Sequence, residues 1–286
     1  MYKLLALNID GTILKNNGRL SRETKEAVDY VRKKGVYVTL MTSRNFLSAR
    51  KVAKALRLDG MLITFQGALI GKSLDHRLFA AVIPEERTFN IVQILENFPC
   101  NIRLMHERYS LGNRKKVKRN LVVQTVLSSS DPFFYPTQFV DSLGDVLIDE
   151  PMAVPKIDVY FADDAEREEA ARLLASAIPS IDMIMQPEGK MEIVPQGVSK
   201  LAGLRRLTQH LGISLKETVV IGDGLDDLPA IEAAGLGVAM GNAPLEVKRV
   251  ADWVTRSNEQ LGVAYMVKEH FRKQQRIEFL QKLKGR

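Results

Sequence analysis

Two hydrophobic patterns alternate along the 286-residue chain. Continuous apolar runs, typical of strands buried on both faces, lie at 4–9, 36–41, 61–69, 218–224 and 235–242. The segments between them, at about 21–35, 44–56, 199–211 and 228–234, carry apolar residues at helical spacing with polar caps. Because strands and helices alternate, we expect parallel strand pairing with right-handed crossovers. The pattern therefore predicts an α/β fold.

The pattern changes between residues 82 and 194, where prolines are frequent and the strands are shorter. We expect helices at 85–97, 114–125 and 164–177, and strands at 101–106, 156–162, 181–185 and 191–194. This mixture is typical of an α+β sheet that is covered on one side. The simplest domain assignment is a core at 1–81 and 195–286, with an inserted α+β domain at 82–194.

Polar side chains follow three of the predicted core strands. They are Asn8 and Asp10 after the first, Thr42 and Ser43 after the second, and Asp223, Asp226 and Asp227 after the fourth. Because parallel strands present their carboxyl ends at one edge of a sheet, these groups can converge there. Acids with few histidines nearby are suited to Mg²⁺, whereas hydroxyls before a helix bind phosphate. With Lys200 as a point charge, the set indicates phosphoryl chemistry.

Each of these residues also has a purely structural interpretation. The turn at Asp10 could simply end a core strand, and 223–227 could be a solvated loop. Thr42 is more easily explained as a helix cap, and Lys200 as a surface residue. The order of the residues and the predicted topology, taken together, favour the functional interpretation.

Composition limits the other possibilities. The one cysteine, Cys100, rules out an internal disulfide and is interpreted as a core residue. No apolar run approaches the about 20 residues of a membrane span, and the first residues lead directly into a strand, so we expect a cytoplasmic protein without a membrane partner.

Part of the net charge of +7 lies in two basic segments, Arg114–Arg119 and the tail Lys268–Arg286. The tail carries apolar residues at helix-like spacing and is expected to form an amphipathic helix packed on the body. These apolar residues are Phe271, Ile277, Leu280 and Leu283. Since no known binding module surrounds either segment, solvated basic faces are favoured over a nucleic-acid site.

Four segments of the chain resemble the motifs of the haloacid dehalogenase superfamily, in its Cof-type branch of sugar-phosphate and nucleotide-like phosphatases. They are "NIDGTI", "TSR", "EIVPQGVSK" and "GDGLDDLPAIEAAGLGVAMGNA". The resemblance covers essentially the whole chain and implies a Rossmann-like core with an inserted C2-type cap. It also implies Mg²⁺ as cofactor and a small phosphorylated metabolite as substrate, hydrolysed through an aspartyl-phosphate in a cleft between core and cap.

The resemblance places the nucleophile position on Asn8, the general acid/base on Asp10, the phosphate-binding hydroxyl on Thr42, the phosphate-binding lysine on Lys200, and the metal carboxylates on Asp223 and Asp227. From the residues themselves we add Asn8 and Asp10 as metal positions and Ser43 as a phosphate-binding position, and Asp226 stands where the family directs an amide at the phosphate. This chain departs from the family at three of its polar positions. It has Asn8 in place of the nucleophilic aspartate, and Gln66 and Asp226 where the family usually has asparagine.

The change at position 8 should impair hydrolysis, because a neutral amide oxygen is a much poorer nucleophile than a carboxylate. Asp226 adds an acid where position 8 loses one, so the local number of acids is unchanged and metal binding is expected to survive. Three explanations are open: an engineered Asp-to-Asn change, a natural relative without hydrolysis, or an enzyme that activates water with Asp10 or Asp226. The joint change at 66 and 226 favours a natural, divergent member. The resulting hypothesis is a protein that binds Mg²⁺ and a phosphorylated metabolite and hydrolyses it slowly or not at all, with a non-catalytic regulatory protein as the alternative.

Overall fold

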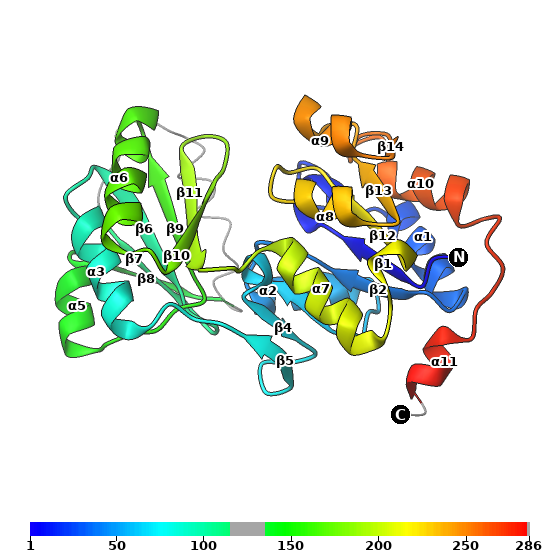
Figure 1. Cartoon of the computed structure of the whole chain (residues 1–286), viewed down its shortest axis with the longest axis horizontal. Coiled ribbons are helices and arrows are strands. Elements are labelled where there is room, and N and C mark those ends of the chain that lie inside the picture. The colour runs from blue at the N-terminus through cyan, green and yellow to red at the C-terminus, as the bar shows by residue number, and fades with distance from the viewer. Residues whose placement is uncertain (115–134, 285–286) are drawn as a thin grey trace. The chain divides into compact units, whose positions relative to one another are not determined.

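The computed structural model describes residues 1–114 and 135–284 and contains two compact units (Figure 1). Unit 1 consists of Met1–Phe79 and Ser199–Arg286, and unit 2 of Ala80–Val198. Among the described residues, no helix is long and apolar enough to cross a membrane. Each unit has its own sheet and its own core, so the two are described separately.

Unit 1 is built on a five-stranded sheet whose strands all pair in parallel, as the sequence predicts. In spatial order the strands are β14 (Trp253–Val254), β13 (Leu236–Ala239), β12 (Thr218–Gly222), β1 (Leu4–Leu7) and β2 (Tyr37–Leu40). Every residue of β1, β12 and β13 is buried, which explains why these strands are apolar without alternation. The central position of β1 between β12 and β2 brings the three strand ends to one edge of the sheet.

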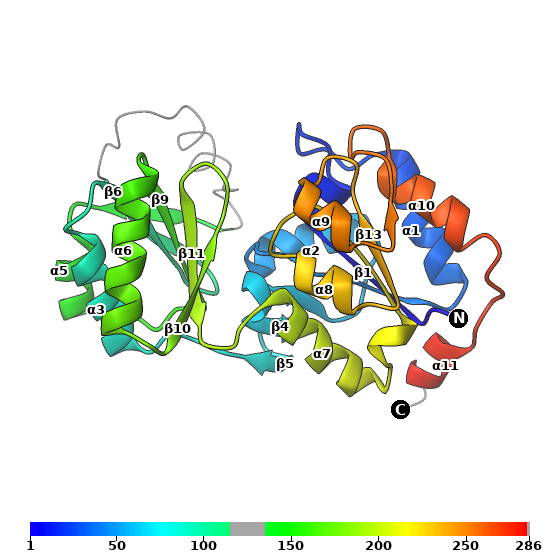
Figure 2. The ribbon, with the colours of Figure 1, turned by 45° about the horizontal axis from the view of Figure 1, so that its top comes forward.

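The helices described for unit 1 accompany the sheet (Figure 2). They are α1 (Arg22–Lys33), α2 (Phe46–Ala55), α7 (Lys200–Leu211), α8 (Leu228–Ala233), α9 (Leu245–Val250), α10 (Gly262–His270) and α11 (Phe279–Lys284). The predicted caps are confirmed: Ser21 accepts a hydrogen bond from the Thr24 amide, and Ser199 accepts one from the Ala202 amide. These caps satisfy amides that the first helical turn leaves free.

The strand predicted at 61–69 is wrong as a single element. It is divided into β3 (Leu62–Thr64) and β4 (Leu69–Gly71), which pair antiparallel, and β5 (Arg77–Ala80) completes a separate three-stranded sheet. The chain reverses between them because Phe65, Gln66 and Gly67 all have positive φ angles, of 50°, 60° and 99°. This sheet is linked to the end of β2 by a parallel bridge between Met41 and Ile63 and by a hydrogen bond from the Thr42 amide to the Ile63 carbonyl at 2.9 Å.

The C-terminal tail also differs from its prediction. It does not form one amphipathic helix, because the chain between α10 and α11 is pinned to the end of α1, where the Ile277 amide donates to the Lys34 carbonyl at 2.8 Å. Phe271 is buried at the end of α10, whereas Phe279 and Leu283 pack against the core of unit 1. The expectation that the tail packs on the body is confirmed, but its continuous helix is not.

Unit 2 contains a six-stranded sheet in the order β10 (Ile181–Met185), β11 (Lys190–Pro195), β9 (Lys156–Phe161), β6 (Cys100–Met105), β7 (Ser110–Asn113) and β8 (Thr137–Val140). Only the β7–β8 pair is parallel among these described strands. Helices α3 (Glu85–Leu95), α5 (Leu143–Asp149) and α6 (Asp164–Ala177) cover one face, as Figures 1 and 2 show. The sequence did not predict β7, β8 or α5, because these elements are short.

The basic segment Arg114–Arg119 lies outside the described residues except for its first member, and so does the helix predicted at 114–125. Arg114 forms an exposed ion pair with Asp141 at 3.3 Å. The prediction of a solvated basic face therefore stays a prediction for the rest of this segment.

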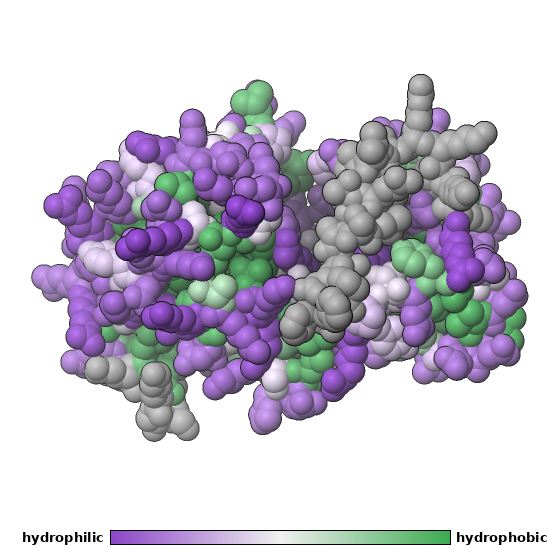
Figure 3. All heavy atoms as spheres, turned by 180° about the vertical axis from the view of Figure 1, so that it is seen from behind, coloured by the Kyte–Doolittle hydropathy of each residue, from purple (hydrophilic) through white to green (hydrophobic). Residues whose placement is uncertain are grey.

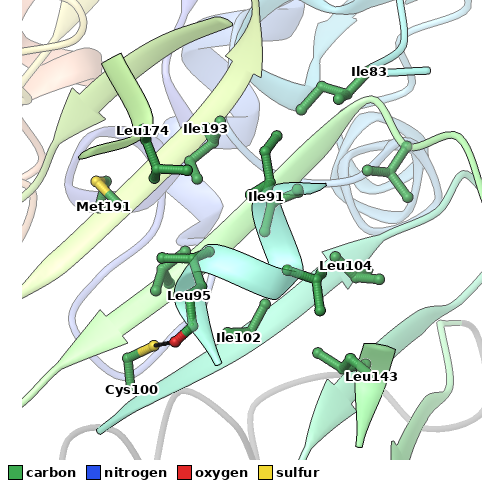
Figure 4. Packing of buried hydrophobic residues seen from close by; sticks show 14 of the residues in the cluster. Ile83, Ile91, Leu95, Cys100, Ile102, Leu104, Leu143, Leu174, Met191 and Ile193 are labelled. Carbon is green, nitrogen blue, oxygen red and sulfur yellow. Dashed lines mark hydrogen bonds between the residues drawn. The ribbon is translucent and has the colours of Figure 1, made fainter. Parts of the chain in front are cut away.

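The core of unit 2 lies between its sheet and its helices (Figure 4). Cys100 is fully buried there, and its thiol donates a hydrogen bond to the Leu95 carbonyl at 3.3 Å. This confirms the interpretation of Cys100 as a core residue. The surface is different in character: Figure 3 shows mostly hydrophilic side chains on the face seen there, with smaller apolar patches between them.

Candidate active site

The site in unit 1 begins at the end of β1, where Asn8 leads into a tight loop over Ile9–Ile13. Gly11 in this loop has a φ angle of +67°, and a Cβ atom there would lie 1.9 Å from Oδ2 of Asp223. Glycine is therefore required both for the backbone conformation and for the close approach of the aspartate. The parallel pairing of β1 with β12 is what brings Asp223 to the loop.

Asn8 is the centre of this loop's hydrogen bonds. Its Nδ2 atom donates to Oδ1 of Asp223 and to the backbone carbonyl of Asp10, both at 3.0 Å. Its Oδ1 atom accepts from the Ile9 amide at 2.8 Å and lies 3.5 Å from Nζ of Lys200. Each atom of the amide faces groups of the opposite hydrogen-bonding type, which fixes its orientation.

Asp223 receives a second hydrogen bond, from the Thr12 hydroxyl at 2.7 Å. Burial raises the pKa of Asp223, while the hydrogen bonds from Thr12 and Asn8 act in the opposite direction because they stabilise the carboxylate. The carboxylate is thus held in place by two neutral donors.

Lys200 lies at the first turn of α7, and its side chain is only 2% exposed. Its Nζ atom contacts Oδ1 of Asp227 at 2.6 Å and Oδ2 of Asp226 at 3.0 Å. Burial disfavours the charged lysine, but the attraction of these two carboxylates outweighs burial and raises the pKa of Lys200. The other oxygen of Asp227 accepts from the backbone amides of Asp223 and Gly224. The interpretation of Lys200 as a surface residue is therefore excluded.

Gln66 and Asp226, two of the positions that differ from the family pattern, contact each other. Nε2 of Gln66 donates to Oδ2 of Asp226 at 2.7 Å, and Gln66 is fully buried. Asp226 therefore has two donors, Lys200 and Gln66, and both are directed at its Oδ2 atom. Because an asparagine at position 66 would have a shorter side chain, the contact with Asp226 depends on the exchange at position 66 as well as on the one at position 226.

Asp10 is directed differently from the other acids. Both of its carboxylate oxygens pair with the guanidinium of Arg44, at 2.6 and 2.5 Å, and its side chain is 58% exposed. Arg44 is part of the "TSR" segment, but the sequence analysis assigned it no role. Its place one residue after two candidate hydroxyl residues was the signal that could have identified it.

The predicted phosphate hydroxyls lie on the loop after β2. Thr42 is fully buried, and its hydroxyl accepts from the Arg44 amide at 3.1 Å, whereas Ser43 is half-buried. Helix α2 is capped by Asn45, whose side chain accepts from the Ser48 amide. The helix N-terminus therefore begins further along the chain than Ser43.

The four predicted metal positions do not form an oxygen cage in this arrangement. The Asp10 carboxylate is taken by Arg44, and the Asp227 carboxylate is paired with Lys200. Asn8 presents its N–H groups, not its oxygen, to Asp223. In residues 1–114 and 135–284, no three His, Cys, Asp or Glu side chains are grouped closely enough to hold a metal ion. The donor set as arranged does not fit a divalent cation.

The parallel sheet, the turn from Asn8 to Asp10 after its central strand, and the lysine buried among acids are the arrangement of a haloacid dehalogenase-like core. A model of the haloacid dehalogenase-like hydrolase family matches residues 5–267, so the chain belongs to that family.

Relatives of known name support this assignment. The chain is 54% identical over 280 residues to the stress response protein YhaX of Bacillus subtilis, covering 98% of this chain and 97% of that protein. It is 29% identical to the B. subtilis 5-amino-6-(5-phospho-D-ribitylamino)uracil phosphatase YcsE, covering 93% and 94% of the two chains. A solved haloacid dehalogenase-like hydrolase from B. subtilis superimposes with a TM-score of 0.81 at 25% identity, covering 94% of this chain and 99% of the other.

Proposed function

We propose that this chain binds a phosphorylated small molecule at the carboxyl ends of the parallel strands of unit 1 and hydrolyses it slowly or not at all. The observation that carries the proposal is the amide of Asn8, which stands at the nucleophile position and is fully engaged in hydrogen bonds. The family, and relatives that are named phosphatases, support a phosphate ester as ligand.

The chemistry of Asn8 explains the expected loss of hydrolysis. A carboxylate attacks phosphorus with a charged oxygen, whereas the Asn8 oxygen is neutral and already accepts the Ile9 amide. Attack would require this hydrogen bond to break, and the product would not be an acyl phosphate. The covalent route is therefore blocked at its first step.

Recognition of a phosphate would depend on the positive groups of the same edge. Lys200 and Arg44 supply charge, and the Thr42 hydroxyl and Ser43 lie on the loop that carries Arg44. Asp226 already occupies one donor of Lys200, so a bound phosphate would compete with this carboxylate. We therefore expect weak binding, and we expect Asp226 to set its strength.

A second candidate function is slow hydrolysis by direct attack of water. The observation that favours it is Asp10, whose carboxylate is more than half exposed and is oriented by both nitrogens of Arg44. Each carboxylate oxygen has a further lone pair besides the one that accepts from Arg44, so the exposed group can still accept a proton from water. This candidate does not use the Mg²⁺ that the family resemblance implies, because the donor set as arranged does not fit a divalent cation.

One experiment separates the two candidates. Phosphate release is measured from a panel of sugar phosphates and an aryl phosphate, with Mg²⁺ and with chelator, for the chain as written and for Asn8→Asp and Asp10→Asn. No turnover, together with a phosphate-dependent rise in the melting temperature, supports the binding protein. Turnover that Asp10→Asn abolishes supports direct attack of water. Absence of both turnover and phosphate binding contradicts both candidates.

The Asn8→Asp variant tests the chemical reasoning itself. A large gain of turnover would mean that the nucleophile is the missing part of the machinery. No gain would mean that the changes at Gln66 and Asp226 also prevent catalysis.

A further inference from the structure

We infer that the side-chain amide of Asn8 takes the place of a cation at the end of β1, so that this site is complete without a divalent metal. Nδ2 of Asn8 lies 3.0 Å from Oδ1 of Asp223 and 3.0 Å from the carbonyl oxygen of Asp10. These are two oxygens of the predicted metal positions. The amide bridges them with its two N–H groups.

The two bridged oxygens need a positive partner because both carry negative charge or partial charge. Asp223 is packed against the loop so closely that no side chain fits at Gly11. Asp223 is partly buried, and a partly buried carboxylate beside a carbonyl is costly unless donors satisfy it. Asn8 and Thr12 together provide three hydrogen bonds to this pair of oxygens. The N–H groups of the amide thus stabilise the Asp223 carboxylate and the Asp10 carbonyl, as a bound cation would otherwise do.

The amide cannot act as an oxygen ligand by rotating in place. If its two ends exchanged, the oxygen would face the Asp223 carboxylate and the Asp10 carbonyl. The NH₂ group would then face the Ile9 amide and the ammonium of Lys200. Four favourable contacts would become unfavourable, so the orientation that excludes a cation is the stable one.

Asn242, which follows β13 and contacts the same loop, offers a matched control. Its Nδ2 atom donates to the backbone carbonyl of Gly11 at 2.9 Å, and its oxygen accepts from the Asn258 amide at 3.0 Å. Asn242→Asp therefore makes the same chemical exchange beside a carbonyl of the same turn. The two variants differ in one respect: among the described residues, the Asn242 amide donates to no carboxylate, whereas the Asn8 amide donates to Asp223.

The test is thermal unfolding in chelator and in millimolar Mg²⁺ for the chain as written, Asn8→Asp and Asn242→Asp. We expect Mg²⁺ to leave the melting temperature of the chain as written unchanged. Asn8→Asp should melt several degrees lower in chelator, because three acceptors then face one another, and Mg²⁺ should restore most of this loss. Asn242→Asp should show no recovery with Mg²⁺. Equal stabilisation of all three proteins by Mg²⁺, or no recovery of Asn8→Asp, would overturn the inference.

A second measurement holds even if Asn8→Asp does not fold. Mn²⁺ is added to the ¹⁵N-labelled chain as written, and the backbone signals of Ile9, Asp10 and Gly224 are followed. A cation bound at this site would broaden these signals first, because of its unpaired electrons. We expect no selective broadening, and selective broadening would refute the inference. Cation and phosphate binding are measured separately, so this inference and the proposed function can fail independently.

Discussion

Lys200→Met is the perturbation that most directly tests how the site is held together. The lysine side chain is 2% exposed, and its partners Asp227 and Asp226 are 0% and 9% exposed. Methionine has a similar length and removes only the charge and its hydrogen bonds. Two buried carboxylates would then lie together without a counter-charge.

The magnitude follows from the burial of the pair. Removing one partner of a buried ion pair costs about 3–5 kcal/mol, because the remaining charge is left uncompensated. Since a domain is stable by only about 5–15 kcal/mol, this is a large part of the total. With a urea dependence of about 1–3 kcal/mol per molar, the unfolding midpoint should fall by roughly 1–5 M.

The assay is urea unfolding followed by tryptophan fluorescence. Trp253 is the one tryptophan of the chain and stacks on Tyr265 in unit 1, so its emission reports the unit that contains Lys200. Arg22→Met is the control, because Arg22 pairs with Glu26 at the surface. A loss for Lys200→Met as small as that for Arg22→Met would refute the reasoning.

The pH dependence of the Lys200 contribution has a defined sign. The pKa of Lys200 is raised in the folded protein, so its contribution is fully present below the ordinary lysine pKa. It is lost only as the pH rises through the raised folded value. The difference from Lys200→Met should therefore persist at neutral and mildly alkaline pH.

Two further predictions concern the same edge of the sheet. Asp226→Asn should tighten the binding of inorganic phosphate at least about fivefold. A like charge some 4 Å from the phosphate costs about 1 kcal/mol in bulk water and about 4 kcal/mol in a partly buried site, and the variant removes this charge. Unchanged affinity in calorimetry would contradict the competition for Lys200. Gly11→Ala should destabilise unit 1 much more than Gly18→Ala, because both have positive φ but only the Gly11 Cβ would meet Asp223, at 1.9 Å, and nothing lies within 4 Å at Gly18. Equal losses in urea unfolding would argue against that contact.

Sequence reasoning predicted strands β1, β2, β12 and β13 of the parallel sheet because they are apolar runs, but it missed β14, which has only two residues. It failed at residues 61–69 because hydrophobicity does not reveal backbone handedness. Phe65 has a φ angle of 50°, which is uncommon for a bulky side chain, and no local residue preference predicts it. The prediction of one helix in the tail failed for a related reason. The apolar residues do have helical spacing, but the Ile277 amide donates to the Lys34 carbonyl and the helix is interrupted there.

The candidate residues could be found from sequence, but their partners could not. Asp10 was expected among the metal ligands, yet both of its carboxylate oxygens accept hydrogen bonds from the guanidinium of Arg44. Lys200 was easily taken for a surface residue, because burial at a helix start depends on what packs against it. Such contacts depend on side-chain direction, which the order of residues along the chain does not specify.

The exchanges at positions 8, 66 and 226 form one connected set around Lys200. Counting charges along the sequence suggested that the acid gained at Asp226 would replace the one lost at Asn8 and preserve metal binding. In the structure the two positions serve different neighbours: Asp226 pairs with Lys200 and Gln66, while Asn8 faces Asp223. An acid on the lysine side cannot supply a ligand on the Asp223 side. The unchanged number of acids therefore conceals a redistribution: the acid at position 226 pairs with Lys200, while the amide at position 8 donates a hydrogen bond to Asp223.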